Sequence, residues 1–208
     1  MAKILVVRHG HSYANKKGLS RFGTEVNDNE LGLTPLGEKQ IANTSLKLEA
    51  YLRNQDIQIS NVNIYTSTLM RAIETGTVIK NKLGVSCIEH NPVLNEIHSE
   101  YTKPEDKELM ISLMRNIGRL IKQSREEGKI PFDDPEIGYI LKAKHDELQE
   151  YFNTLSSKDE TSIVVSHGLS LWTYITEHTT DKNLYEPIKH GQIVLLENNQ
   201  AQTLTLNK

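Results

Sequence analysis

The sequence is poor in cysteine, in excess charge of one sign and in long apolar runs. Cys87 is the single cysteine among 208 residues, so an internal disulfide framework is excluded and a reducing compartment is expected. The first apolar run, Ile4–Val7, is too short for a signal peptide, and no segment approaches the length needed to cross a bilayer. The sequence therefore predicts a cytoplasmic protein with no membrane partner.

The charge is nearly balanced. The 24 Lys and Arg residues and the 27 Asp and Glu residues leave a formal net charge of −3, which does not support a nucleic-acid-binding or membrane-binding surface. Hydrophobic residues make up 37% and charged residues 25% of the chain, which is ordinary for a soluble protein with a sizeable core. We expect one domain over residues 1–208, with a cap insertion at about 97–138.

Apolar runs alternate with helical patterns along most of the chain. Thr34, followed by a proline, indicates a helix start, and Gly84 indicates a helix stop. The predicted strands are Lys3–Arg8, Val62–Ser67, Val85–His90, Thr161–Ser166 and a closing hairpin that turns at Asn198–Asn199. Four helices are predicted: one that starts at Pro35, two that cover Leu69–Leu83 and Glu136–Leu155, and one that starts at Leu169. The apolar face of the first is expected to be Ile41, Leu46, Leu48 and Leu52. Arg8–Leu33 is expected to be a long loop.

This alternation predicts an α/β fold, a three-layer sandwich with a mostly parallel central sheet. Unbroken apolar strands are typical of parallel sheets that are covered on both faces. The C-terminal hairpin adds an antiparallel edge. Ligands of such sheets bind outside the carboxyl ends of the strands, and we expect a helical lobe to be inserted over the active site there.

Polar side chains follow the ends of four predicted strands. They are Arg8 and His9 after the first strand, Arg71 on the first helical turn after the second, Glu96 after the third, and His167 and Gly168 after the fourth. Because the carboxyl ends of parallel strands meet at one edge of a sheet, we expect these groups to converge. Two guanidinium groups and several helix N-termini at one edge favour a dianionic ligand such as a phosphate group.

The histidines indicate catalysis as well as binding. A neutral imidazole is a competent nucleophile toward phosphorus, and Arg8 and Arg71 are expected to lower the pKa of His9. In this interpretation His9 attacks in line, while Arg8, Arg71 and His167 hold the equatorial oxygens. Glu96 protonates the leaving alcohol and then deprotonates the water that releases phosphate.

Five motifs, in the same order, resemble those of the histidine phosphatase superfamily, which includes cofactor-dependent phosphoglycerate mutase and fructose-2,6-bisphosphatase. VVRHGHSYAN resembles the R-H-G-x-[ST]-x-x-N signature, LTPLGEKQ the L-T-x-x-G-x-x-Q start of the first helix, and TSTLMRAIET the S-x-x-x-R-A-x-E-T motif. LNE resembles the segment that carries the proton donor, and VVSHG the segment that carries the second histidine. The motifs span residues 4 to about 171.

The resemblance implies a role for individual residues. His9 corresponds to the phosphorylated histidine and Glu96 to the proton donor. The implied phosphate ligands are Arg8, Asn15, the backbone of Gly23, Arg71, His167 and the N–H of Gly168. The resemblance further implies a phosphohistidine route, without a metal or a cofactor, on a small phosphorylated metabolite.

Several positions depart from the family pattern. His11 stands where the family commonly has Glu or Gln after R-H-G, and the spacing between Gly23 and Leu33 is stretched. Ile97 stands where the mutases have Arg directly after L-N-E, and Ala14 where they have Trp before the signature Asn. The differences at 14 and 97 favour a phosphatase over a mutase.

Three other functions stay open at this point. A mutase-type phosphoryl transfer would use the same residues. His9 and His11 form an H-x-H pair that could bind zinc for hydrolysis with His167 and a carboxylate, although two arginines would repel the cation. A phosphate-binding module would keep the pocket without turnover. The sequence does not indicate the oligomeric state, and it assigns no role to His90, His145, His178 or His190.

Overall fold

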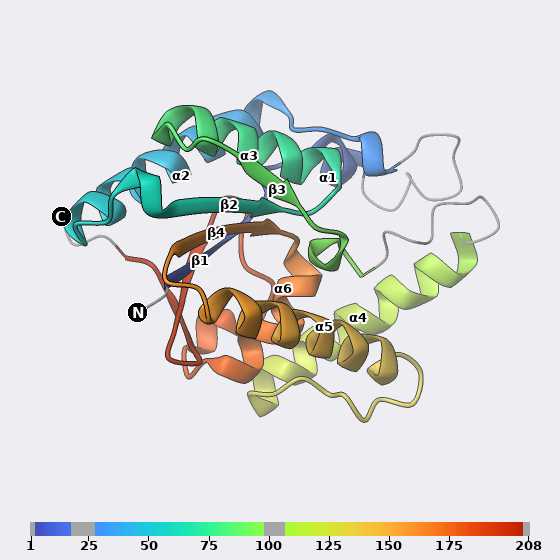
Figure 1. Cartoon of the computed structure of the whole chain (residues 1–208). Coiled ribbons are helices and arrows are strands. Elements are labelled where there is room, and N and C mark those ends of the chain that lie inside the picture. The colour runs from blue at the N-terminus through green and yellow to red at the C-terminus, as the bar shows by residue number, and fades with distance from the viewer. Residues whose placement is uncertain (1–2, 18–27, 98–106, 206–208) are drawn as a thin grey trace.

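A six-stranded sheet lies between two layers of helices in the computed structural model, which describes residues 3–17, 28–97 and 107–205 (Figure 1). The strands are β1 (Lys3–Arg8), β2 (Val62–Thr66), β3 (Ile88–His90), β4 (Thr161–Ser166), β5 (Ile193–Glu197) and β6 (Gln200–Thr203), in the order β3-β2-β4-β1-β5-β6. β1 to β4 are parallel, whereas β5 is antiparallel to β1 and β6 to β5. The predicted three-layer α/β fold with an antiparallel C-terminal edge is confirmed.

The helices are divided between the two faces of the sheet. α2 (Pro35–Asn54) and α3 (Met70–Leu83) cover one face, on the side of the short α1 (Tyr13–Lys17), whereas α5 (Gly138–Ser156) and α6 (Gly168–Ile175) cover the other, with α4 (Lys107–Glu127) beside α5 (Figure 1). Alternation along β1 supplies both cores: Leu5 and Val7 pack with α2 and α3, while Ile4 and Val6 pack with α5 and α6.

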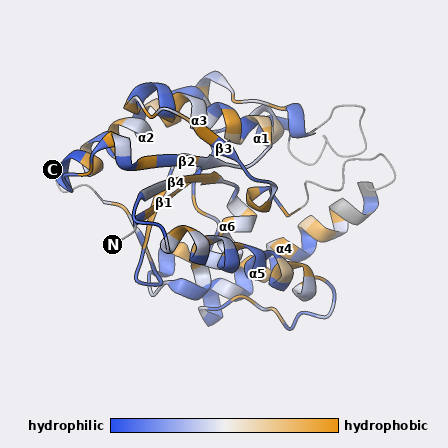
Figure 2. Ribbon diagram, viewed as in Figure 1, coloured by the Kyte–Doolittle hydropathy of each residue, from blue (hydrophilic) through white to orange (hydrophobic). Residues whose placement is uncertain are grey.

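The hydropathy of the elements matches this layering. Figure 2 shows hydrophobic residues along the central strands and a mixture of hydrophobic and hydrophilic residues along the covering helices. Such mixed helices bury one side and expose the other to solvent. Within the described ranges, a helix long and apolar enough to span a membrane is not found.

Several element boundaries follow the predicted signals. The Thr34 hydroxyl accepts a hydrogen bond from the Gly37 N–H at 3.2 Å, so Thr34 caps α2 as expected. Gly84 ends α3 with a φ of 76°. Asn198 and Asn199 have φ values of 53° and 58°, the left-handed pair that a tight two-residue hairpin favours. The predicted closing hairpin is therefore confirmed.

Three predictions are wrong in detail. Leu46, predicted on the apolar face of α2, is 50% exposed, because at 3.6 residues per turn it lies about 140° around the helix from buried Ile41. β3 starts at Ile88 rather than Val85, since only 88–90 pair with β2. The segment Arg8–Leu33, predicted as a loop, contains α1.

α4 and the start of α5 form a small hydrophobic core beside the sheet. Leu113, Ile117 and Leu120 of α4 lie on one helix face and are buried together with Ile137 and Trp172. This core attaches α4 to α5 and α6. The predicted cap at about 97–138 includes the four of these residues that precede α5, but not Trp172. Part of this cap (98–106) lies outside the described residues, and its boundaries stay a prediction.

The chain after β1 passes very close to the first turn of α2. A Cβ on Gly37 would overlap the His11 carbonyl oxygen, and a Cβ on Gly10 would lie 2.7 Å from the Gly37 carbonyl oxygen. The His11 N–H donates to Gln40 Oε1 at 2.8 Å across the same contact. Glycine at both positions permits this approach, which holds the residues that flank His9 against α2.

Gly37→Ala should therefore destabilise the protein by about 1–3 kcal/mol, because the backbone must shift to relieve the overlap. Gly118→Ala is the matched control: Gly118 is exposed in α4, a Cβ there would meet nothing within 4 Å, and helix propensity should stabilise the variant by up to about 1 kcal/mol. Urea unfolding measures both free energies. A Gly37→Ala variant as stable as the parent protein would contradict the close approach.

Candidate active site

A cavity of about 220 Å³ opens at the carboxyl ends of the parallel strands. Its lining residues are Arg8, His9, Ala14, Asn15, Arg71, Glu96, Met114, Gly168, Leu169 and Pro187. The ring of His167 adjoins the cavity, with its centroid 4.9 Å from that of His9. The side chains expected to converge thus lie together. Gly23, the remaining predicted phosphate ligand, lies outside the described residues.

His9 is oriented by its own loop. The side chain is 3% exposed, and Nδ1 lies 2.7 Å from the Gly10 carbonyl oxygen. Because a carbonyl oxygen only accepts, Nδ1 carries the proton and Nε2 keeps its lone pair. Burial, followed by the charges of Arg71 and Arg8, holds the pKa of His9 well below its ordinary range. The ring is therefore neutral at neutral pH.

Arg8 lies against the start of α6. Its Nη1 donates to the Ile188 carbonyl oxygen at 2.7 Å, and a Cβ on Gly168 would come within 2.8 Å of its Cζ, so glycine there lets the guanidinium group lie at this position. Burial lowers the pKa of Arg8, the charge of Glu96 raises it and that of Arg71 lowers it. Among the described residues, the buried Nε has no hydrogen-bond partner. A bound anion would satisfy this donor.

Arg71 is placed by the first turn of α3 and is only 3% exposed. One turn later, the Thr75 hydroxyl donates to the Arg71 carbonyl oxygen at 2.8 Å and accepts from the Gly10 N–H at 3.2 Å. Glu74, between them, accepts from the Leu33 N–H at 2.5 Å. These bonds connect α3 to the segments that follow β1, and so fix the position of Arg71 relative to His9.

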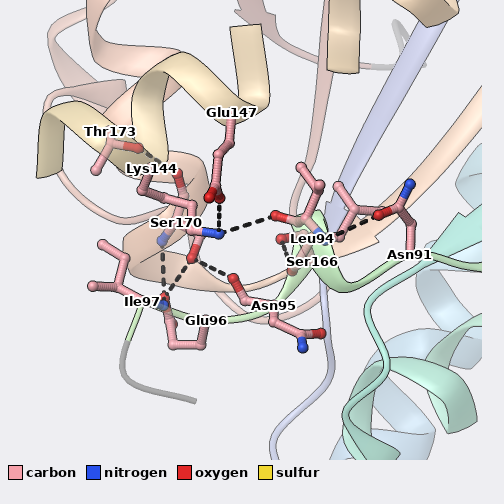
Figure 3. Close-up of polar contacts among 11 residues, drawn as sticks. Asn91, Leu94, Asn95, Glu96, Ile97, Lys144, Glu147, Ser166, Ser170 and Thr173 are labelled. Carbon is pink, nitrogen blue, oxygen red and sulfur yellow. Dashed lines mark hydrogen bonds and ion pairs between the residues drawn. The ribbon is translucent and has the colours of Figure 1, made fainter. Parts of the chain in front are cut away.

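Glu96 is held by donors at the start of α6 (Figure 3). Its Oε1 accepts from the Ser170 N–H and hydroxyl, both at 2.9 Å, and from the Ile97 N–H at 3.1 Å. Its Oε2 lies 3.3 Å from the Leu169 N. Glu96 is buried, with an exposed fraction of 7%, and it lines the same cavity as His9. The donors at the start of α6 thus hold the carboxyl group at the edge of this cavity.

The loop that carries Glu96 is itself fixed to the core. The Ser166 hydroxyl donates to the Leu94 carbonyl oxygen at 2.7 Å, and the Ser170 hydroxyl lies 2.9 Å from the Asn95 carbonyl oxygen (Figure 3). Lys144 of α5 lies beside this loop and contacts Glu147 at 2.7 Å (Figure 3). Glu96 therefore has a defined position even though it follows a short strand.

His167 is fully buried between β4 and α6. Its Nε2 lies 2.7 Å from the Ser67 hydroxyl, which also accepts from the Leu69 N–H at 3.1 Å. Ser67 thus connects the second histidine to the start of α3, the helix that carries Arg71. Ring contacts, hydrogen bonds and neighbouring positions in the chain thus link the two histidines to the two arginines.

Asn15 and His11 lie in different surroundings. Asn15 lines the cavity, and its Oδ1 accepts from the Ser12 N–H and hydroxyl at 3.0 and 2.8 Å, so its amide NH₂ is the group suited to an anion. His11 does not line this cavity, and its Nδ1 lies 2.9 Å from the Thr34 hydroxyl. Of these two residues, therefore, only Asn15 lines the cavity.

Sequence reasoning missed His190. Its ring centroid lies 5.5 Å from that of His9 and 5.7 Å from that of His11. Burial, with the charges of Arg8 and His11, lowers the pKa of His190 to about 4. A signal was present: His-Gly ends the run at His9, recurs at His167 and occurs a third time at His190, directly before β5.

The geometry does not favour the zinc interpretation. In the part of the chain that the structure describes, no group of three or more His, Cys, Asp or Glu side chains is arranged to bind a metal ion. The His9 ring lies against His167, whereas His11 contacts Thr34, so the H-x-H pair does not form one ligand set. Instead the cavity combines a neutral imidazole, two guanidinium groups and a carboxyl group, which suits a tetrahedral anion.

Comparison with solved structures shows the same fold. A mutant of phosphoserine phosphatase from Entamoeba histolytica in complex with phosphoserine is 17% identical, with a TM-score of 0.56 and coverage of 99% of this chain and 96% of the other. A mycobacterial glucosyl-3-phosphoglycerate phosphatase is 14% identical (TM-score 0.61; 99% and 98% covered). Phosphoglycerate mutase from Bacillus anthracis is 19% identical (TM-score 0.57; 99% and 92% covered).

The family can also be assigned from the sequence as a whole. The model of the histidine phosphatase superfamily, branch 1, matches residues 4–199, which include all five motifs and every residue of the cavity lining. This protein therefore belongs to the histidine phosphatase superfamily.

Proposed function

We propose that this protein is a phosphomonoester hydrolase that works through a phosphohistidine intermediate on His9, with Glu96 as the proton donor. One observation carries the proposal: Nδ1 of His9 donates to its own loop, which leaves Nε2 as a neutral nucleophile beside the buried Arg71 and the partly buried Arg8. Membership of the superfamily, and a fold shared with phosphatases and a mutase, support it.

In the first step, His9 Nε2 attacks phosphorus and forms the P–N bond while the ester P–O bond breaks. Glu96 gives its proton to the departing alcohol oxygen. Arg8, Arg71 and His167 hold the equatorial oxygens, with the N–H of Gly168 and the amide of Asn15 as further ligands, and Gly23 is proposed to contribute through its backbone.

In the second step, the Glu96 carboxylate takes a proton from water as the water oxygen attacks phosphorus. The P–N bond breaks, inorganic phosphate leaves, and Glu96 is again protonated. The sum is one phosphomonoester and one water converted to one alcohol and one phosphate. Every proton is accounted for by this chain's own residues, so the proposed route includes neither a metal nor a cofactor.

The position after Glu96 supports a phosphatase over a mutase. Ile97 is 7% exposed and packs in the apolar cluster with Leu113 of α4. An apolar side chain there offers no charge to hold the carboxylate of a phosphoglycerate. The cavity of about 220 Å³ suits a small phosphorylated metabolite, and we propose such a substrate for a single cytoplasmic domain with a cap at about 97–138.

The phosphohistidine is tested by trapping. Protein incubated briefly with ³²P-labelled phosphomonoesters (sugar phosphates, phosphoglycerates and phosphoserine) at neutral pH and quenched in base should carry acid-labile phosphate on His9. His9→Ala should carry none and should lose turnover. His90→Ala, which removes an exposed histidine at the end of β3, is the control and should retain both. Full turnover by His9→Ala would disprove the proposal.

Arg71→Ala should lower kcat/KM for phosphomonoesters by about 10²-fold or more, because it removes a buried cation from the developing charge on the phosphoryl oxygens. Lys82→Ala removes a lysine with a 45% exposed side chain from the other end of α3 and should change kcat/KM little, since solvent screens its charge. Steady-state kinetics compare the two. Similar losses in both variants would mean that Arg71 does not contact the phosphoryl group.

Glu96→Gln should slow alkyl phosphates much more than nitrophenyl phosphate, because nitrophenolate leaves without a proton. The glutamine side chain can still accept from the Ser170 N–H, so the loop should keep its position. The ratio of kcat/KM values for the two esters, in the variant and the parent protein, measures the effect. If both esters are slowed equally, Glu96 is not the donor to the leaving group.

A further inference from the structure

We propose that His190 is a positioning residue for His9: its ring closes the outer side of the nucleophile and excludes water from it. The inference rests on the proposed function, since it concerns the nucleophile of that reaction. It starts from the ring contact, in which the His190 centroid lies 5.5 Å from that of His9 at an interplanar angle of 54°.

The turn that carries His190 is fixed to both neighbouring elements. The Gly191 N–H donates to the Arg8 carbonyl oxygen at 2.9 Å, and the Gly191 carbonyl oxygen accepts from the Thr44 hydroxyl of α2 at 2.6 Å. Gly191 has a φ of 69°, which glycine adopts without strain. The Lys189 N–H donates to Gln192 Oε1 at 2.8 Å within the turn. His190 is therefore held in place by its backbone.

His190 stands between two cavities. His9 lines the cavity of about 220 Å³ that holds the proposed phosphate site, and His190 does not. His190 lines a separate cavity of about 630 Å³ on the outer side, together with Lys47, Lys189 and Gln192. The imidazole of His190 thus separates the ring of His9 from this outer, polar cavity. Removing it would give water a path to the nucleophile.

The surroundings keep His190 itself neutral. Its Nε2 is buried and has no hydrogen-bond partner among the described residues, and its pKa is lowered to about 4. Arg8, His9 and His11 face it from within the protein, and the charged groups Lys47, Asp181, Glu186 and Lys189 line the cavity outside it. A neutral His190 ring excludes water from His9 and so increases its desolvation. Desolvation is the largest cause of the lowered pKa of His9.

His190→Ala should hydrate His9 and raise its pKa toward the ordinary value, by about one pH unit or more. The His9 resonances of ¹⁵N-histidine-labelled protein, titrated by NMR, report this pKa without any turnover. His190→Phe keeps an aromatic wall, so its His9 pKa should stay close to that of the parent protein. Lys189→Ala, which changes the exposed neighbour, is the control and should show no shift.

Kinetics provide the second readout. In the proposed reaction the neutral form of His9 is the nucleophile, so activity is lost as the pH falls through the pKa of His9. The acid limb of the kcat/KM profile should therefore move to higher pH in His190→Ala. It should not move in His190→Phe. If the alanine variant does not fold, His190→Asn makes the same comparison. An unchanged His9 pKa in a folded alanine or asparagine variant, or an equal shift with Phe, would overturn the inference. Failure of phosphate trapping on His9 in the parent protein would instead refute the proposed function.

Discussion

The parallel pairing of β1 with β4 is the constraint on which the site depends. Arg8 and Ser166 are partners in this register, so the residues that follow them, His9 and His167, leave the sheet side by side. The His9 N–H donates to the Ser166 carbonyl oxygen at 3.1 Å and extends the pairing by one step. A slip of one residue would turn the buried faces of β1 outward, so the register is fixed by the two hydrophobic cores rather than by the polar groups themselves.

This register places two positively charged side chains in a largely buried part of the protein. Arg8 and Arg71 both disfavour the protonated form of His9, and Arg71 also lowers the pKa of Arg8. Glu96 has the opposite effect and raises the pKa of Arg8. Its carboxyl group also accepts hydrogen bonds from the N–H groups of Ile97 and Ser170. Among the described residues, two guanidinium groups and one carboxyl group line this cavity. The proposed phosphate dianion would balance the positive charge, and the groups proposed to bind it are the ones that keep His9 neutral.

Much of the site could be predicted because its residues follow parallel strands, whose carboxyl ends meet at one edge. That rule brought Arg8, His9 and His167 together from two apolar runs, each followed by a His-Gly pair. It could not place His190, which precedes β5. Because β5 is antiparallel to β1, its amino end lies at the edge where β1 has its carboxyl end. The hairpin pattern indicates how β5 pairs with β6, but not which strand lies on its other side. The predicted burial of Leu46 was wrong for a different reason, because an apolar residue on a helix need not lie on the buried face of that helix.

The antiparallel edge contributes more than closure of the sheet. The turn before β5 contacts Arg8 twice, through the Ile188 carbonyl oxygen on its guanidinium group and the Gly191 N–H on its backbone. It therefore orients the cation as well as carrying the ring that covers His9. The five motifs end near residue 171, so this turn lies outside them. On the proposed role of His190, a chain that keeps every motif could still differ in the ionisation of His9, because the turn that contacts Arg8 and His9 belongs to a segment that the motifs do not describe.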